Sequence, residues 1–525
     1  MSLRIPVGTT SFASSPSTAL QPDLGDGIYR NPILHADYSD PDAIRVGEDF
    51  WLVASSFSHV PGLPLLHSKD LVNWRLVAHA LPRLVPEEVF ATPQHGKGVW
   101  APSIRHHAGS FWIYYGDPDF GLFLVTASDP RGPWSKPVLV KSCRGLIDPC
   151  PLWDDDGAVY LIHGWAKSRA GFANVLTLLK LTDDGLGVAE DLGVVIDGNQ
   201  LSGYRTLEGP KFYKRDGWYY IFAPAGGVET GWQSVFRSRS IQGPYADRIV
   251  LAQGRTSING PHQGALVDLS DGASWFLHFQ DKGAYGRVVH LQPVTWREGW
   301  PLIGVNQNEA GCGEPVLQYA KPAIKPFTCL PPAPLEPAGS DEFSSMTLGL
   351  QWQWQANPTP GWHSLAARPG WIRLFAQPVT THSLYAAPHL LLQKFPAPEF
   401  TVDTVLETTS GSAGLIVFGN DYAWIGVRDG QLVQVTAHEA HRQPTFIEST
   451  ASARHAGTVH LRLQVTQGAL CVFAFSVDGH TYFALGGSFK ASVAHWVGAK
   501  VGLFANGGSG DFADFDHFRV AGYTR

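Results

Sequence analysis

The sequence has few charged residues and no cluster of basic ones. Only 16% of its 525 residues are charged, and the formal net charge is -7. Because phosphate binding depends on clustered Lys and Arg side chains, this composition argues against a nucleic-acid partner. No stretch approaches the roughly 20 apolar residues that are needed to span a bilayer, so we expect no membrane segment.

The N-terminus also lacks the continuous apolar segment of a secretory signal, because Gly, Ser and Thr interrupt residues 1–26. We therefore expect the protein to be cytoplasmic. Cysteine is scarce, scattered and odd in number, which suits reduced thiols better than a disulfide framework. The five cysteines are Cys143, Cys150, Cys312, Cys329 and Cys471.

Glycine, proline and aromatic residues are abundant instead. The chain has 56 Gly, 38 Pro, 18 Trp, 16 Tyr and 28 Phe. This composition favours many short strands and tight turns over long helices. Since the chain is too long for one ordinary core, we expect an all-β protein of two or three domains.

A short pattern recurs five times in the first part of the chain. In each copy, a polar turn with Asp or Gly precedes an aromatic, strongly strand-forming run. The copies are residues 47–53, 109–115, 156–162, 216–222 and 271–277. A repeat of roughly 50 to 60 residues is typical of propeller blades. We therefore predict a five-bladed β-propeller over residues 28–319, preceded by an N-terminal extension at residues 1–27.

A second pattern falls between copies of the first. A polar turn that closes on an aromatic ring occurs at residues 67–74, 127–134 and 239–245. Such a turn fits the outer part of a blade, where the ring can cover the sheet edge. Two periodic patterns in phase strengthen the prediction of a propeller.

The composition changes after the predicted propeller. Residues 320–340 are rich in proline, which predicts a stiff linker. The prolines are Pro322, Pro326, Pro331, Pro332, Pro334 and Pro337. At residues 341–525, apolar and polar residues alternate between Asp-Gly and Asn-Gly turns. This alternation predicts a C-terminal β-sandwich.

Three acidic residues, Asp40, Asp148 and Glu208, each lie beside a proline or glycine turn. Turn chemistry alone explains any one of them, since Asp before Pro and Glu before Gly-Pro are ordinary turn residues. However, they lie shortly before the first, third and fourth copies of the repeat. Because the inner strands of a propeller meet at a central funnel, we expect the three carboxylates to converge there.

Three carboxyl groups in one pocket favour acid–base chemistry. Like charges and partial burial both disfavour ionisation, so the pKa of at least one group should be raised. A carboxyl group with a raised pKa can serve as an acid while another remains a base. Hydrolysis of a glycosidic bond needs this division of labour.

Several strings along the predicted propeller resemble family 43 of the glycoside hydrolases, of the β-xylosidase and α-L-arabinofuranosidase type. They are residues 31–34, 39–45, 55–57, 61–62, 67–74, 99–103, 145–149 and 208–210. Residues 510–516 resemble the sandwich that is appended to such β-xylosidases. The resemblance implies a five-bladed β-propeller followed by a β-sandwich of the concanavalin-like jelly-roll type.

The resemblance implies unequal roles for the three carboxylates. Asp40 would be the general base that deprotonates water, and Glu208 the general acid that protonates the departing sugar oxygen. Asp148 would orient Glu208 and tune its pKa. The family acts by single displacement with inversion, which places a water between base and acid. Ser39 departs from the family pattern, in which Pro or His often precedes the base, and this would change the pocket wall.

Four further residues match family positions around the sugar. Phe57 and Trp100 match aromatic positions near the terminal sugar, and Arg287 matches an arginine that binds sugar hydroxyls or the acid pair. His262 matches a histidine at the funnel centre, beside calcium in some relatives. The structural alternatives are that Phe57 and Trp100 are core residues, that Arg287 is a surface residue and that His262 is a satisfied polar group. Since calcium prefers six to eight oxygen ligands, one imidazole does not define a metal site, and we expect no required cofactor.

The leading interpretation is an exo-acting, inverting glycosidase that releases terminal β-D-xylose or α-L-arabinofuranose from hemicellulose-derived oligosaccharides. We place xylan β-xylosidase activity first, because the appended sandwich resembles that of β-xylosidases, where it helps to close the pocket. An endo-arabinanase shares the propeller and the acidic trio but needs an open groove. A non-catalytic carbohydrate-binding or protein-interaction propeller is the alternative outside enzymes. The preferred sugar, a metal near His262 and a homo-oligomer stay open.

Overall fold

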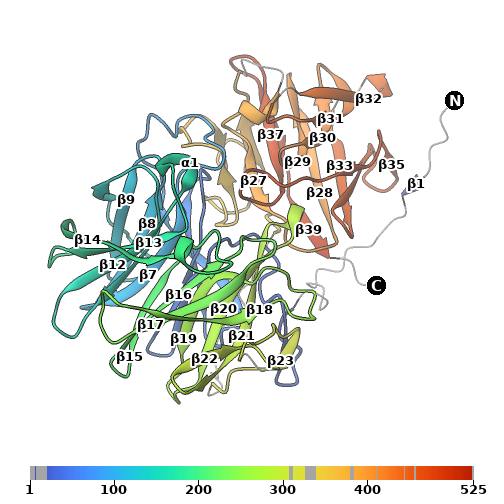
Figure 1. Cartoon of the computed structure of the whole chain (residues 1–525). Helices are drawn as coiled ribbons and strands as arrows, with labels where there is room; N and C mark the ends of the chain where they lie inside the picture. The colour runs from blue at the N-terminus through green and yellow to red at the C-terminus, as the bar shows by residue number, and fades with distance from the viewer. Residues whose placement is uncertain are drawn as a thin grey trace.

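The computed structural model describes residues 6–7, 21–306, 311–324, 339–378, 383–409, 411–442, 444–454 and 457–522. It contains a propeller and a sandwich that lie side by side (Figure 1). Most of the predicted N-terminal extension, most of the proline-rich linker and Cys329 lie outside the described residues. The other four cysteines are free thiols. No helix in the described part of the chain is long and apolar enough to cross a membrane.

The propeller has five blades, and each blade is an antiparallel sheet of four consecutive strands. Blade 1 contains β3 (Asp42–Val46), β4 (Asp49–Val53), β5 (Gly62–Ser68) and β6 (Trp74–Leu81). Blade 2 contains β7 (Trp100–His107), β8 (Ser110–Asp117), β9 (Gly121–Ala127) and β10 (Val138–Ser142). Blade 3 contains β11 (Leu146–Trp153), β12 (Val159–Trp165), β13 (Val175–Leu181) and β14 (Val188–Asp197). Blade 4 contains β15 (Lys211–Arg215), β16 (Trp218–Ala225), β17 (Trp232–Ser238) and β18 (Ala246–Ala252), and blade 5 contains β19 (His262–Asp268), β20 (Ser274–Asp281), β21 (Arg287–Arg297) and β22 (Trp300–Ile303).

The prediction of a five-bladed propeller is confirmed, and each copy of the first repeat is the first hairpin turn and second strand of a blade. Both faces of these second strands are buried, because every blade packs against two neighbours. A separate apolar core fills each gap between blades. The gap between blades 1 and 2, for example, contains Val53, Ile104 and Ile113. Aromatic and β-branched residues are well suited to such a surface.

The first strand of each blade lines the centre of the ring. Strand β3 contacts β7 and β19, and β11 contacts β7 and β15. Since these strands run in the same direction from the same position in each blade, their N-terminal ends meet at one mouth of the central channel.

The second repeat forms the turn between the third and fourth strands of blades 1, 2 and 4. In each turn the aromatic side chain donates a hydrogen bond to a carbonyl of its own turn. The three bonds run from Trp74 to Leu71 (2.9 Å), from Trp134 to Pro130 (3.0 Å) and from Tyr245 to Ile241 (2.7 Å). The ring therefore fixes its own turn as well as covering the sheet edge.

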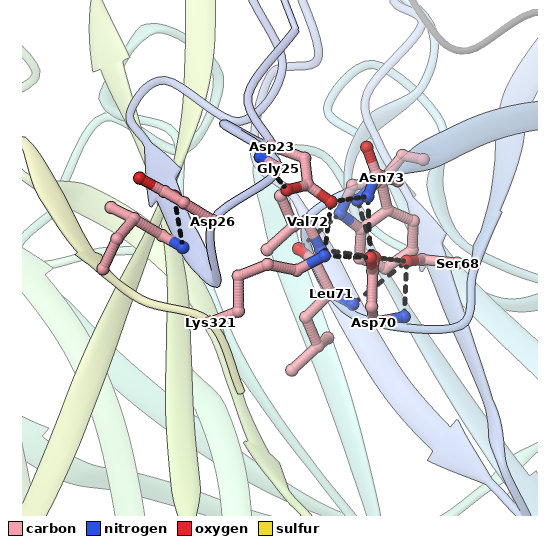
Figure 2. Close-up of polar contacts among 11 residues, drawn as sticks. Asp23, Gly25, Asp26, Ser68, Asp70, Leu71, Val72, Asn73 and Lys321 are labelled. Carbon is pink, nitrogen blue, oxygen red and sulfur yellow. Dashed lines mark hydrogen bonds and ion pairs between the residues drawn. The ribbon is translucent and has the colours of Figure 1, made fainter. Parts of the chain in front are cut away.

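The turn of blade 1 also joins both ends of the propeller (Figure 2). Oδ1 of Asp70 accepts hydrogen bonds from the backbone N–H groups of Val72 (3.0 Å) and Asn73 (2.7 Å). Lys321, which follows the last blade, forms ion pairs with Asp70 (3.0 Å) and with Asp23, which precedes the first blade. Strand β2 (Ile28–Arg30) pairs with β23 (Gln318–Ala320) close by. The ring is thus closed outside the blades, without a blade of mixed N- and C-terminal strands.

The C-terminal domain is a β-sandwich, as predicted, with sheets of ten and seven strands. The ten-stranded sheet contains β1 (Pro6–Val7), β25 (His363–Ser364), β26 (Ile372–Phe375), β28 (Phe400–Thr408), β33 (Val459–Thr466), β34 (Leu470–Ser476), β35 (Tyr482–Ala484), β36 (Phe489–Lys490), β38 (Phe512–Phe515) and β39 (Arg519–Gly522). The seven-stranded sheet contains β24 (Gln353–Trp354), β27 (Leu391–Lys394), β29 (Ser412–Phe418), β30 (Tyr422–Arg428), β31 (Gln431–His438), β32 (Thr445–Arg454) and β37 (Lys500–Asn506). The helical segments of the described chain are α1 (Lys167–Ala170), η2 (Gly198–Gln200), η3 (Gly283–Tyr285) and η4 (Leu384–Ala386).

Specific backbone contacts join the two domains. Val60 of the propeller and Trp354 of the sandwich exchange N–H to carbonyl hydrogen bonds of 3.0 and 2.6 Å. The amide side chain of Asn357 accepts from the N–H of Leu84 (2.8 Å) and donates to its carbonyl (2.9 Å). Such paired contacts fix the orientation of the sandwich on the propeller.

Candidate active site

The three acidic residues that the sequence singled out lie at the same mouth of the channel. Asp40 directly precedes β3, Glu208 precedes β15, and Asp148 lies near the start of β11, where the pairing with β12 shifts register. Asp40 and Asp148 have left-handed backbone conformations, with φ of 54° and 57°. Such φ values are unusual outside glycine, and they turn each side chain out of the ordinary strand alternation.

Asp40 is 6% exposed, and both of its carboxylate oxygens are held. Oδ1 accepts a hydrogen bond from Nη1 of Arg287 (3.1 Å), and Oδ2 accepts one from the hydroxyl of Ser55 (2.6 Å). The same hydroxyl oxygen accepts from the backbone N–H of Ala101 (2.7 Å). Groups from three blades therefore fix the orientation of this carboxylate.

Asp148 is 4% exposed and lies close to both other carboxylates. Its Oδ2 accepts a hydrogen bond from the backbone N–H of Gly209 (2.7 Å), the residue after Glu208. Burial, followed by the negative charges of Glu208 and Asp40, raises the pKa of Asp148 well above the usual range of an aspartate. The expectation that one carboxyl of the group has a raised pKa is met at Asp148.

Glu208 is the most accessible member of the trio, with a side chain that is 27% exposed. Its Oε1 lies 3.2 Å from Nε2 of His262, which is 1% exposed. Nδ1 of His262 is buried and has no hydrogen-bond partner among the described residues. His262 therefore contacts the candidate acid directly.

His262 has few neighbouring side chains that could bind a metal ion. The described residues contain no group of three or more His, Cys, Asp or Glu side chains that could hold a metal ion. Calcium needs several oxygen ligands, whereas His262 brings one imidazole and its neighbour Glu208. A calcium ion here would depend on water for most of its ligands.

The two predicted aromatic residues form one wall beside the trio. The ring of Phe57, which is 3% exposed, lies 6.1 Å from that of Trp100 in an edge-to-face arrangement. The φ of Phe57 is 50°, and its backbone pairs with that of Val99. Phe57 also packs against Ala494 and Val497 of the sandwich. Both domains therefore contribute to this wall.

Trp496, which sequence reasoning did not find, is brought to the same wall by the sandwich. Trp496 is 43% exposed and has a φ of 68°. Its ring lies 5.7 Å from that of Trp100, and its centre is 5.9 Å from the guanidinium carbon of Arg287. No repeat or motif marks this residue, because its position depends on how the two domains dock. Ser55, by contrast, lies within one of the family strings.

Comparisons with known proteins agree with this architecture. Residues 29–301 match the family described as Glycosyl hydrolases family 43, and residues 340–521 match the domain described as Beta xylosidase C-terminal Concanavalin A-like domain. A protein of Xylanibacter ruminicola, whose name assigns it provisionally as a beta-xylosidase, is 39% identical over 91% of this chain and 86% of its own length. A non-reducing end alpha-L-arabinofuranosidase of Bacteroides ovatus is 31% identical over 94% of this chain and 95% of its own length.

The fold is also similar to that of a solved structure. The crystal structure of xylan beta-1,4-xylosidase from Bacillus halodurans aligns with a TM-score of 0.81 at 26% identity. The alignment covers 94% of this chain and 99% of that one. Both the propeller and the sandwich therefore have counterparts in that protein.

Proposed function

Because this chain belongs to glycosyl hydrolase family 43, we propose that it is an exo-acting glycosidase that releases terminal β-D-xylose or α-L-arabinofuranose from hemicellulose-derived oligosaccharides. The observation that carries this proposal is the meeting of Asp40, Asp148 and Glu208 at one mouth of the propeller, each with different partners. Relatives that are similar over nearly the whole chain and are named for these two activities support the substrate class.

Asp40 serves as the general base in this proposal. Its carboxylate is buried and fixed by Arg287 and Ser55, so it presents a defined oxygen to a water molecule. Arg287 cannot compete for the proton, because a guanidinium is always charged in proteins. Ser55 keeps the carboxylate from rotating, since its own hydroxyl is anchored by Ala101.

Glu208 serves as the general acid, which suits its greater exposure toward the substrate. Asp148 acts on it from behind, through the backbone N–H of Gly209 and through its charge. The raised pKa of Asp148 keeps a proton beside the acid at a pH above the usual range of an aspartate. His262 positions the acid from its other side.

The reaction is a single displacement with inversion. The oxygen of water forms a bond to the anomeric carbon while one of its protons passes to Asp40. The glycosidic bond breaks at the same time, and its electron pair stays with the leaving oxygen, which takes the proton from Glu208. The products are a free sugar of inverted anomeric configuration and a shortened oligosaccharide, and exchange with solvent restores the protons of the enzyme.

Exo action is supported by the sandwich loop at residues 494–499. Trp496 of this loop lies against Trp100 and close to Arg287, on the side of the trio. Because Trp496 forms a wall at this place, the space beside the terminal sugar is short. An endo-arabinanase needs an open groove at this place, so the loop disfavours that alternative.

Two nitrophenyl glycosides, the β-D-xyloside and the α-L-arabinofuranoside, test the substrate class. We expect hydrolysis of both, with the higher kcat/KM for the xyloside. A protein that hydrolyses only internal bonds of arabinan, and neither glycoside, would contradict the proposal.

A Glu208→Ala variant separates the hydrolase from a carbohydrate-binding propeller. Loss of the general acid should lower kcat on xylobiose by about 10² to 10⁴-fold, which is the usual contribution of such a group. The loss should be smaller on the nitrophenyl xyloside, because nitrophenolate leaves without much help from an acid. A binding module would instead bind its ligand unchanged and show no turnover before or after the substitution.

We propose that hydrolysis needs no bound metal, since the carboxylates supply both the acid and the base. Dialysis against EDTA should leave kcat/KM unchanged. A loss of activity that Ca²⁺ restores would contradict this and would point to a calcium ion beside His262.

A further inference from the structure

Asp37 lies where the sandwich meets the candidate active site. Its side chain is 6% exposed and comes from the segment between β2 and β3. Oδ1 accepts a hydrogen bond from the backbone N–H of Arg287 (2.9 Å), and Oδ2 accepts one from the backbone N–H of Gly498 (3.0 Å). One carboxylate therefore joins strand β21 of the propeller to the sandwich loop that carries Trp496.

The surroundings of Asp37 leave little room for adjustment. A Cβ atom at Gly286 would lie 2.4 Å from Cγ of Asp37, and one at Gly498 would lie 2.5 Å from the backbone nitrogen of Gly286. The N–H of Ala499 also donates to the carbonyl of Ala284 (2.7 Å). Two glycines thus let two backbones meet around one carboxylate, and a shift of either backbone is passed to the other.

Both partners of Asp37 lead to the candidate active site. Arg287 donates to Asp40 (3.1 Å), and its guanidinium carbon lies 4.9 Å from the centre of the Phe279 ring. Trp496 lies two residues before Gly498, and its ring centre is 5.9 Å from the same guanidinium carbon. The carboxylate of Asp37 therefore fixes the backbone of Arg287 and the loop of Trp496 relative to each other.

We propose that Asp37 is a positioning residue that sets Arg287, and through it Asp40, into the geometry for hydrolysis only when the sandwich is docked. The inference rests on the proposed function, in which Asp40 is the base. It assigns the sandwich a second role besides forming a wall, because the carboxylate contact couples its docking to the catalytic pair.

The test compares Asp37→Asn with Asn357→Ala. The asparagine keeps the shape of Asp37, but its NH₂ group must face one of the two N–H donors. We expect kcat/KM to fall about 10- to 100-fold, as is usual when catalytic geometry is disturbed. The loss should be the same on the nitrophenyl xyloside and on xylobiose, because a better leaving group does not relieve a defect on the side of the base. Asn357→Ala removes the contact at Leu84 from the same interface, but the Val60–Trp354 pair and the Asp37 contact still hold the sandwich in place, so kcat/KM should stay within about twofold.

A double substitution distinguishes the loss of this specific link from general destabilisation of the protein. In an Arg287→Ala background, Asp37→Asn should lower kcat/KM by less than about threefold, because its route to Asp40 is already cut. If Asp37→Asn does not fold, Gly498→Ala tests the link from the sandwich side, with the same expected loss of kcat/KM.

Two results would overturn the role of Asp37. The first is an equal effect of Asp37→Asn and Asn357→Ala on kcat/KM. The second is a double variant with Arg287→Ala whose loss of kcat/KM equals the product of the two single losses. A wild-type protein that hydrolyses neither glycoside would instead overturn the proposed function. The two failures are therefore distinguishable.

Discussion

At the scale of single residues, the carboxyl group of Asp148 shows how environment assigns roles within the trio. Three carboxylates share one mouth, and Asp148, which is 4% exposed, lies beside the other two. Burial and these charges raise its pKa, so the trio holds a proton at a pH at which an isolated aspartate is ionised.

An Asp148→Asn substitution tests the role of this proton. The amide oxygen can still accept the N–H of Gly209, but the side chain no longer carries charge or binds a proton. Because burial and the charges of Glu208 and Asp40 raise the pKa of Asp148, this carboxyl holds its proton to higher pH, and its removal should move the alkaline limb of the kcat/KM profile to lower pH, by about one unit. A pH profile of hydrolysis measures this directly. An alkaline limb that stays in place, or moves to higher pH, would contradict the coupling.

At the scale of strands and turns, closure of the propeller depends on one turn and one distant lysine. Asp70 satisfies two backbone N–H groups of its turn and also pairs with Lys321 (Figure 2). The side chains of Lys321 and Asp70 are 22% and 25% exposed, so their ion pair is weakened by solvent. The backbone hydrogen bonds of Asp70 should therefore contribute more to stability than the ion pair does.

The paired variants Asp70→Ala and Lys321→Ala separate these contributions. We expect Asp70→Ala to lower the free energy of unfolding by about 1–3 kcal/mol, because two backbone donors lose their acceptor. Lys321→Ala should cost at most about 1 kcal/mol, which is typical of a partly exposed ion pair. Denaturant unfolding of the full chain measures both. An equal or larger loss for Lys321→Ala would show that the ion pair, and not the turn, secures the ring.

How far the sequence predicts these elements depends on how local their causes are. The five hairpins were predictable because each has its own turn residues and aromatic strand. The second repeat appears in three of the five blades. The corresponding turn of blade 5 is the two-residue connection at Glu298–Gly299 between β21 and β22, and that of blade 3, residues 182–187, has no aromatic residue. The pairing of Lys321 with Asp70 spans 251 residues, and no local pattern records it.

At the scale of the whole molecule, the site residues that were predictable from the sequence are those whose positions follow from local or repeated patterns. Asp40, Asp148 and Glu208 occupy repeated positions on blades, so the propeller fold brings them together once it is recognised. Arg287 and His262 contact Asp40 and Glu208 respectively. Asp37 and Trp496 lie outside the sequence repeats. Their positions depend on how the two domains dock, and the residues at this interface have no periodic sequence pattern.

Truncation of Trp496 tests the contribution of the sandwich to substrate binding. Trp496→Ala should raise KM for xylobiose about 3- to 10-fold, the loss expected for one aromatic contact, whereas Trp496→Phe should stay close to wild type. Since the side chain is 43% exposed, the melting temperature should change little. Unchanged kinetics in Trp496→Ala would show that the sandwich does not contribute to the sugar site through this ring.

The central claim is that Asp40 and Glu208 hydrolyse a terminal glycosidic bond by a single displacement. Proton NMR of a β-xyloside during the first minutes of hydrolysis tests it most directly, because it identifies the anomer that the enzyme releases before mutarotation. We expect α-xylose to appear first and β-xylose only later. Release of β-xylose as the first product would mean a covalent intermediate and would contradict the roles assigned to the two carboxylates.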